Sequence, residues 1–224
     1  MIPIVAGLVA GAAHVLAGPD HLTAIAPLAA RRPQRAWLPG VRWGLGHSTG
    51  VGVVGALALW LRGLLPVEWL SSWGERAVGV MLFGIGLWAL RGALRTHVHA
   101  HEHEHDGQRH VHFHVHRHGH GHDEAASHLH AHAAFGIGVL HGLAGSSHFL
   151  GVLPALALPT PMAAATYLVA FALGTIGAMA AFSWGVGRLA AGSARRGVRL
   201  YRGLMGACAL AALGVGAFWF VTSF

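Results

Sequence analysis

The chain has 224 residues, of which 54% are hydrophobic and only 10% charged, a balance that is typical of a polytopic membrane protein and excludes an ordinary soluble domain. Its fifteen basic residues are all arginines, but they cluster between apolar runs instead of following one amphipathic face, which argues against nucleic-acid binding. The single cysteine, Cys208, excludes a disulfide within these residues.

Six apolar stretches are long enough to cross a bilayer as helices, which takes about 20 residues each. They lie near residues 4–30, 37–61, 77–94, 133–158, 162–187 and 203–221. The connections that follow the first, third and fifth stretches, together with Arg91 near the end of the third stretch, carry twelve of the fifteen arginines. Because arginine is enriched in cytoplasmic loops, we expect these connections in the cytoplasm, both termini outside, and the chain in the plasma (inner) membrane.

The first span contains the stretch HVLAGPDHLTA, residues 14–24, in which two histidines and an aspartate flank a Gly-Pro pair. Glycine ends a helix readily, and proline suits the first turn of the next helix because it lacks an amide hydrogen. Asp20 would then lie in that first turn, where the helix dipole favours a negative charge. Ionisable groups in hydrocarbon are costly and usually mark a site, so His14, Asp20 and His21 are predicted metal ligands. The alternative for Asp20 is that it only starts a helix.

Three further histidines fall inside predicted spans. His47 lies in WGLGHSTGV of the second span, and His141 and His148 bracket the middle of the fourth. With a rise of about 1.5 Å per residue, all three come near the bilayer midplane. A lone histidine there is often a hydrogen-bonded structural group, but five in one small bundle favour metal ligation. Ser48 is a candidate supporting hydrogen bonder or, alternatively, a small residue for helix packing.

An internal repeat links the two halves of the chain. GAAHVLAGPDHLTAIAP at 11–27 aligns with GVLHGLAGSSHFLGVLP at 138–154, an offset of 127 that keeps both histidines. Three spans separate the copies, so they must run in opposite directions, as in secondary transporters whose site lies on interrupted helices at the repeat interface. Ser146 and Ser147, also candidate site residues, replace Pro19 and Asp20 in the second copy. Only the first repeat therefore supplies a carboxylate.

The predicted architecture is all-α, with about six transmembrane helices in two inverted three-helix repeats, 1–96 and 133–224, whose first and fourth helices are interrupted. Between them, residues 97–132 hold fifteen of the twenty histidines, at nearly every second position. We expect this segment to be cytoplasmic and disordered, because it has few apolar residues. A solvated linker would explain its length, but not so many imidazoles, which are common ligands of nickel, copper, zinc and cobalt. The predicted metal-capturing residues are His97, His99, His101, His103, His105, His110, His112, His114, His116, His118, His120 and His122.

The stretches HVLAGPDHLTAI and LGHSTGV resemble the nickel/cobalt transporter family and its relatives among bacterial nickel and cobalt permeases and exporters. That family has a His–Asp–His signature in an early span and a Leu-Gly-His-Ser-Thr signature in the next. The resemblance covers the first fifty residues, reaches the second half through the repeat, and implies that His14, Asp20, His21 and His47 line a metal path. Here five residues rather than four separate His14 from the Asp-His pair, and the chain is compact beside eight-span members.

The sequence therefore predicts a membrane transporter of a divalent transition metal, with nickel first and cobalt or zinc as alternatives, and with no catalytic cofactor. A metallochaperone or an energy-coupling protein as a partner stays open, and so does the direction of transport. An intramembrane metal-dependent enzyme would also use clustered histidine and aspartate, but it would need a nucleophile or a general base, and we expect no enzyme. A metal sensor or store is the third alternative; it leaves the duplicated midplane ligands unexplained.

Overall fold

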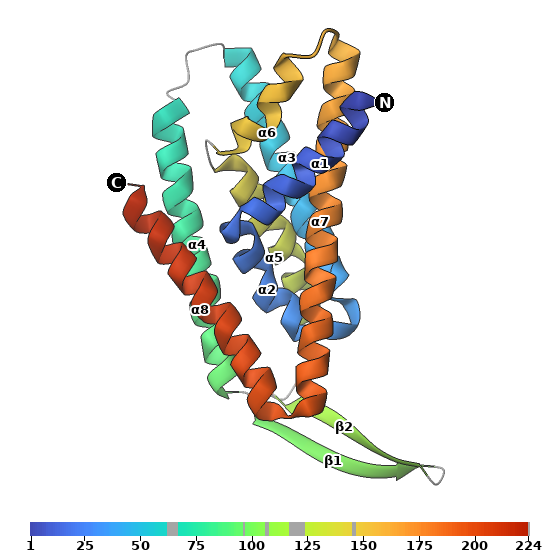
Figure 1. Cartoon of the computed structure of the whole chain (residues 1–224). Helices are drawn as coiled ribbons and strands as arrows, with labels where there is room; N and C mark the ends of the chain where they lie inside the picture. Colours follow the sequence, from blue (N-terminus) through green and yellow to red (C-terminus); the bar gives the residue numbers. More distant parts are fainter. Residues whose placement is uncertain (62–66, 96, 106–107, 117–123, 145–146, 224) are drawn as a thin grey trace.

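The computed structural model describes residues 1–61, 67–95, 97–105, 108–116, 124–144 and 147–223, with side chains described outside 55–71, 95–131, 145–150 and 152. Helices dominate the described chain, and one β-hairpin projects from the bundle (Figure 1). In chain order the elements are α1 (Ile2–Ala17), α2 (Pro19–Arg31), a short 3-10 turn (Pro33–Arg35), α3 (Trp37–Leu61), α4 (Val67–Arg95), β1 (His97–His105), β2 (Gln108–His116), α5 (Glu124–Leu143), α6 (Ser147–Leu156), α7 (Pro161–Arg196) and α8 (Val198–Thr222).

Several of these helices are long and apolar enough to cross a membrane. Within the described residues they are Ser72–Leu94 of α4, Pro161–Arg196 and Val198–Thr222, and α1 with α2 makes a fourth span if the bent pair is counted as one. The chain is therefore a polytopic helical membrane protein. The predicted total of six spans stays a prediction, because α3 and the α5–α6 region include residues outside the described set.

The first span is interrupted at Gly18, as the sequence predicts. Gly18 has extended backbone angles (φ −95°, ψ 97°), and Pro19 begins α2, so that α1 and α2 meet at an angle of 77°. The carbonyl of Gly18 accepts hydrogen bonds from the backbone N–H groups of His21 and Leu22. A Cβ at Gly18 would collide with the His21 ring, so only glycine fits this bend without a shift of that histidine.

The two halves of the bundle pack as counterparts of each other. α1 and α2 run from the end with the N-terminus towards the end with the hairpin, and α5 and α6 run the opposite way (Figure 1). α1 lies along α7, α5 lies along α3, and α4 and α8 pair with each other. In the repeat, α5 and α7 correspond to α1 and α3. The α1–α7 contact is therefore the counterpart of the α5–α3 contact, and the α4–α8 pair is its own counterpart.

Glycines at matched positions let these helices approach closely. A Cβ at Gly11 of α1 would collide with the carbonyl oxygen of Phe171, and one at Gly138 of α5 would collide with that of Trp43. Gly11 and Gly138 are equivalent in the repeat, and so are Phe171 and Trp43 when α7 is aligned with α3 at an offset of 128. Small residues are the usual means of close helix packing in membranes. The same contact thus occurs once in each half.

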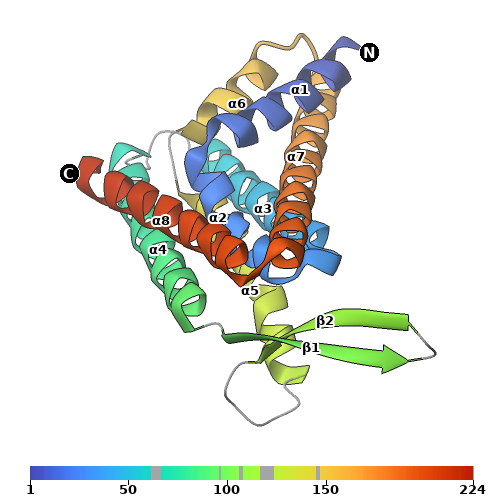
Figure 2. The ribbon, with the colours of Figure 1, turned by 60° about the horizontal axis from the view of Figure 1, so that its bottom comes forward.

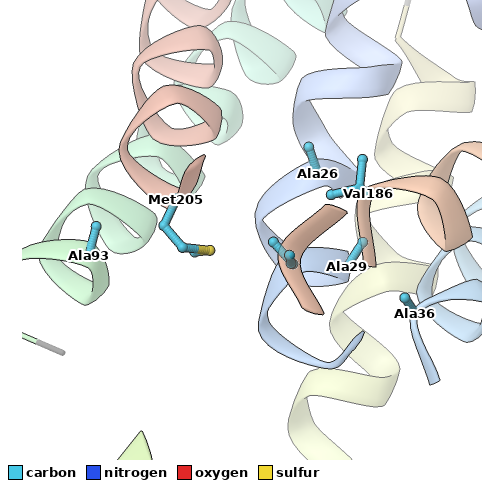
Figure 3. Close-up of a cluster of buried hydrophobic side chains, with 8 residues drawn as sticks. Ala26, Ala29, Ala36, Ala93, Val186 and Met205 are labelled. Atoms are coloured by element: carbon cyan, nitrogen blue, oxygen red, sulfur yellow. The ribbon is translucent and has the colours of Figure 1, made fainter. Parts of the chain in front are cut away.

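At the end of the bundle that carries the hairpin, small residues form a tightly packed core (Figure 3). They come from α2, α4, α7, α8 and the residue just before α3. The buried members are Ala26, Ala29, Ala30, Ala36, Ala93, Val186, Ala190 and Met205. This core holds α2 against α7 and α8, and thereby supports the half-helix that begins at the bend.

Arginines at the same end of the bundle contact neighbouring helices. The guanidinium carbon of Arg31 lies 3.6 Å from the centre of the Trp88 ring. Arg202 donates hydrogen bonds to the carbonyl oxygens of Ala93 (3.0 Å) and Leu94 (2.7 Å), which lie in the last turn of α4. The first, third and fifth predicted connections therefore meet at one end of the bundle, in agreement with the arginine pattern.

The backbone of parts of the segment 97–132, for which the sequence predicts disorder, has regular secondary structure. β1 and β2 form an antiparallel hairpin that extends away from the helices (Figures 1 and 2), and α5 begins at Glu124. The disorder and the cytoplasmic location of this segment in the membrane-bound protein stay predictions. Histidine alternates here with residues such as Val98, Val111 and Phe113, and a period of two residues is that of a strand.

Candidate metal centre

Three histidines from α1, α2 and α3 converge at the bend after α1. His14, His21 and His47 each offer one ligand atom, and these atoms all lie within 4.8 Å of one another. His21 and His47 are buried, and His14 is half-buried. Imidazole nitrogens in such a group are suitable ligands for zinc, nickel, copper and related divalent ions. We call these three residues the histidine triad.

The His14–His21 pair already has the spacing of two ligands of one ion. The Nε2 atoms of the two rings are 3.2 Å apart. Two nitrogens bound to a tetrahedral metal, each about 2.0–2.1 Å from it, are separated by about 3.4 Å. The residues are seven apart in the chain, and the 77° bend between α1 and α2 separates the helices that carry them. A small movement of His47 would complete a three-nitrogen site.

Asp20 orients His21 within this group. The Nδ1–H of His21 donates a hydrogen bond to Asp20 Oδ1 at 2.8 Å, and the other carboxylate oxygen lies 3.7 Å from His141 Nε2. A proton on Nδ1 leaves the lone pair of Nε2 facing His14, as in the carboxylate–histidine pairs that support metal ions. The sequence predicts Asp20 as a direct ligand. That role stays a prediction; in the structure the carboxylate lies at the Nδ1 edge of the His21 ring, and the Nε2 edge faces His14.

Trp43 belongs to the site, although the sequence interpretation missed it. Its ring stacks on that of His47 with centroids 4.8 Å apart and planes 7° apart, and its Nε1 has no hydrogen-bond partner within the described residues. Trp43 precedes His47 by four residues, and residues four apart on a helix share a face. This spacing in the sequence could have predicted the contact. Trp43 also lies 5.4 Å from the His141 ring, as its counterpart Phe171 lies 5.6 Å from the His14 ring.

The second repeat contributes to the same centre through His141. This residue is fully buried, and its ring centroid is 5.5 Å from that of His21, which in turn contacts His14. His14 and His141 therefore share a neighbour instead of forming separate sites on the two sides of the bilayer. Thr175, the counterpart of His47, is buried and donates a hydrogen bond to the carbonyl oxygen of Gly11 at 3.4 Å. The second repeat therefore has no imidazole at the position equivalent to His47.

Other predicted site residues are only partly visible. His148 and Ser147 lie in α6, but their side chains, like those of the predicted metal-capturing histidines of 97–122, lie outside the described residues, as does all of Ser146. The hydroxyl of Ser48 is buried and has no hydrogen-bond partner in the described part of the chain. The neighbouring Thr49 donates to the carbonyl oxygen of Leu45 at 2.8 Å, within its own helix. The structure thus brings together four predicted histidines and Asp20.

Two strings match catalytic motifs, but neither has the required structural context. Gly46–Gly50, GHSTG, fits Gly-x-Ser-x-Gly, and His101–His105, HEHEH, fits His-Glu-x-x-His. The first motif works as a nucleophile on a sharp turn between a strand and a helix, whereas 46–50 lie inside α3. The second needs a helix to bring both histidines to one metal, whereas 101–105 lie in β1.

Comparisons with known proteins place this centre within a membrane family. Residues 4–211 match the family model described as "Cytochrome C biogenesis protein transmembrane region". "Chloroplast protein FOR GROWTH AND FERTILITY 2" of Arabidopsis thaliana is 32% identical over 219 residues, which are 97% of this chain and 56% of that protein. "Chloroplast protein FOR GROWTH AND FERTILITY 1" of the same plant is 32% identical over 211 residues, 94% of this chain and 56% of the relative.

A more limited similarity joins the chain to "Urease accessory protein UreH" of Bacillus sp. (strain TB-90), 30% identical over 93 residues, 41% of this chain and 40% of that protein. The chain spans about half the length of the two Arabidopsis relatives. No solved structure matches the chain. The matching family differs from the nickel/cobalt transporter family that the motifs resemble.

Proposed function

The chain belongs to the family of the cytochrome c biogenesis protein transmembrane region, and within this family we propose that it transports a divalent transition-metal ion through the histidine triad. The observation that carries the proposal is the convergence of His14, His21 and His47 within 4.8 Å at an interrupted membrane helix. The ion is the cargo of this site. Each imidazole binds it in the neutral form, so protons compete with the metal.

The arrangement of the repeats supports movement of the ion rather than storage. Interrupted helices at the interface of inverted repeats are the usual site of alternating access in secondary transporters. Here Asp20 lies between His21 of the triad and His141 of the second repeat. The ion binds first at the triad and passes Asp20 towards His141 when the repeats rock against each other. The carboxylate partly offsets the charge of the ion in this low-dielectric setting.

Nickel is the proposed cargo, followed by cobalt, with zinc as the alternative. The donor set of imidazoles and a nearby carboxylate suits all three ions, so the ligands do not choose among them. The preference rests on the resemblance of the two histidine motifs to the nickel/cobalt transporter family. The similarity to a urease accessory protein over 93 residues is the second observation used for this preference. The proposed location is the plasma membrane, with the hairpin in the cytoplasm.

A thiol relay is a weaker candidate for these residues. The family description concerns cytochrome c, whose haem is attached through a Cys-x-x-Cys-His motif. Exchange between a dithiol and a disulfide within one chain needs two cysteines. The present 224 residues contain only Cys208, which lies in α8 beside the alanine-rich core. The imidazole centre is therefore the better-supported site.

Transport is tested by reconstituting the purified protein in liposomes that contain a metal-sensitive dye. We expect nickel to enter these liposomes faster than protein-free liposomes, with competition from cobalt and zinc and none from magnesium, which prefers oxygen ligands. A sensor or store would bind nickel without entry of the ion into the liposomes. Binding with no flux would therefore contradict transport and leave the site as a store.

A further inference from the structure

An exposed surface of arginines and tryptophans lies where the residues before α3 pack against α7. The hydroxyl of Ser183 donates a hydrogen bond to the carbonyl oxygen of Ala36, and a Cβ at Gly187 would collide with the Ala36 side chain. These contacts hold the turn Pro33–Arg35 beside α7. In each segment, the residues next to the contact are large and exposed. We call them the arginine–tryptophan surface: Arg35, Trp37, Trp184 and Arg188.

The tryptophans of this surface face outwards from the bundle. Trp37 is 49% exposed and Trp184 is 55% exposed. The guanidinium carbon of Arg188 lies 5.7 Å from the centre of the Trp184 ring, one turn earlier on α7. Leu189, which follows Arg188, is also exposed, as expected for a side of α7 that faces lipid. Exposed indole rings beside arginine are typical of the level where lipid headgroups meet hydrocarbon.

The length of α7 places these residues at the membrane boundary. α7 has 36 residues, so it is about 54 Å long, whereas the hydrocarbon core of a bilayer is about 30 Å thick. A centred, upright α7 therefore extends about 12 Å beyond the hydrocarbon at each end, which corresponds to about eight residues. Arg188 is eight residues before Arg196, the last residue of the helix, and Trp184 is one turn deeper. Arg188 thus lies at the level of the headgroups.

The positive charge of this surface has no acidic counterpart among the side chains that the structure describes. The acidic ones are Asp20 and Glu75. Asp20 lies at the histidine triad, and Glu75 lies near the start of α4, at the end of the bundle opposite to the hairpin. Neither forms an ion pair with Arg35 or Arg188. The two guanidinium groups are therefore available to an anion.

We infer that the arginine–tryptophan surface binds the headgroup of an anionic phospholipid. Arg35 and Arg188 supply charge-assisted hydrogen bonds to the phosphate, which guanidinium groups bind well. Basic sites between membrane helices on the cytoplasmic side are typical of anionic-lipid binding, and most arginines of the chain are at this end. A soluble anion fits less well, because Trp184 and Leu189 beside the arginines are apolar and exposed. The inference goes beyond the proposed function, since it involves no residue of the metal centre.

The test measures how brominated lipids quench the tryptophan fluorescence of the full-length protein in detergent. Brominated phosphatidylglycerol, which is anionic, is compared with brominated phosphatidylcholine, whose headgroup has no net charge. Arg35→Gln with Arg188→Gln removes both arginines of the surface. The matched control, Arg91→Gln with Arg199→Gln, removes two exposed arginines from α4 and α8 at the same end of the bundle. Trp184→Phe shows whether the lipid lies beside this tryptophan.

We expect phosphatidylglycerol to quench the unchanged protein at a lower concentration than phosphatidylcholine. The Arg35→Gln, Arg188→Gln protein should bind phosphatidylglycerol about 25-fold more weakly, since each arginine near an anionic headgroup contributes about a factor of five, and the control should bind it like the unchanged protein. Trp184→Phe should reduce the extent of quenching without moving its midpoint. Equal weakening in the two double variants would indicate only a general attraction to positive charge and would overturn the site. Equal quenching by the two lipids, or undiminished quenching of Trp184→Phe, would overturn it as well.

Discussion

Thr175 occupies in α7 the position that His47 occupies in α3. A Cβ at Gly11 would lie 2.9 Å from the backbone nitrogen of Thr175, and a Cβ at the equivalent Gly138 would lie 2.9 Å from that of His47. The backbones are thus matched, but the side chains differ. His47 stacks within the triad, whereas the Thr175 hydroxyl binds the Gly11 carbonyl. A symmetric scaffold therefore carries an asymmetric site, with three imidazoles in one half.

Changing Asp20 to Asn should lower metal affinity more than it lowers stability. The amide keeps an acceptor for the Nδ1–H of His21 but removes the carboxylate charge. We expect nickel affinity to fall about 10- to 100-fold, as for other carboxylates that support a metal-binding histidine. A role as a helix-start residue alone would be worth about 1 kcal/mol of stability. Titration and thermal unfolding in metal-free buffer measure both effects, and unchanged affinity with a lowered Tm would support that minor role.

Removing the histidine-rich segment should affect loading rather than transport. Because α5 begins at Glu124, the deletion should span 97–122 with a short polar bridge, so that α5 remains whole. The triad comes from α1, α2 and α3 and stays assembled. Nickel flux at saturating metal should survive, and flux at low metal should fall. Complete loss of flux in a deletion protein with a normal Tm would contradict a loading role.

Trp43 should matter to the site through its stack on His47. Trp43→Leu removes the aromatic plane and leaves a cavity beside a fully buried histidine, whereas Trp43→Phe keeps a ring, as Phe171 does in the other repeat. We expect Trp43→Leu to reduce nickel affinity and to cost about 3 kcal/mol of stability, near the values for large buried aromatic residues. Phe should recover most of the affinity. If both variants bind nickel like the original protein, the stack has no part in positioning His47.

The glycine contacts that pair the repeats offer a matched test of the fold. Gly138 of α5 packs against the α3 backbone, whereas Gly136 of the same helix has open space where a Cβ would lie. Gly138→Ala should destabilise the protein by about 1–3 kcal/mol through overpacking. Gly136→Ala should be neutral or should stabilise it by up to about 1 kcal/mol, because alanine favours a helix. Thermal unfolding in detergent compares them. Equal Tm values would contradict the close α3–α5 crossing.

Sequence patterns predicted the parts of this molecule that depend on local chemistry. Gly18 and Pro19 indicated a broken helix, and the repeat indicated which residues are counterparts. The sequence could not predict that the Asp20 carboxylate accepts a hydrogen bond from Nδ1 of His21. This contact depends on the 77° bend and on the helices packed around it. In the hairpin, low apolar content favoured disorder, but the alternation that forms strands was already visible in the same residues.

The initial rate of nickel entry into liposomes that contain His47→Thr tests the account most directly. This substitution gives α3 the residue that α7 carries at the equivalent position, and so removes one imidazole from the triad. The matched control is Thr49→Ala, two residues away, whose hydroxyl bonds only within its own helix in the described structure. Transport through the triad predicts that His47→Thr loses nickel entry while Thr49→Ala keeps it, both with near-normal Tm. Equal rates of nickel entry in the two variants would contradict it.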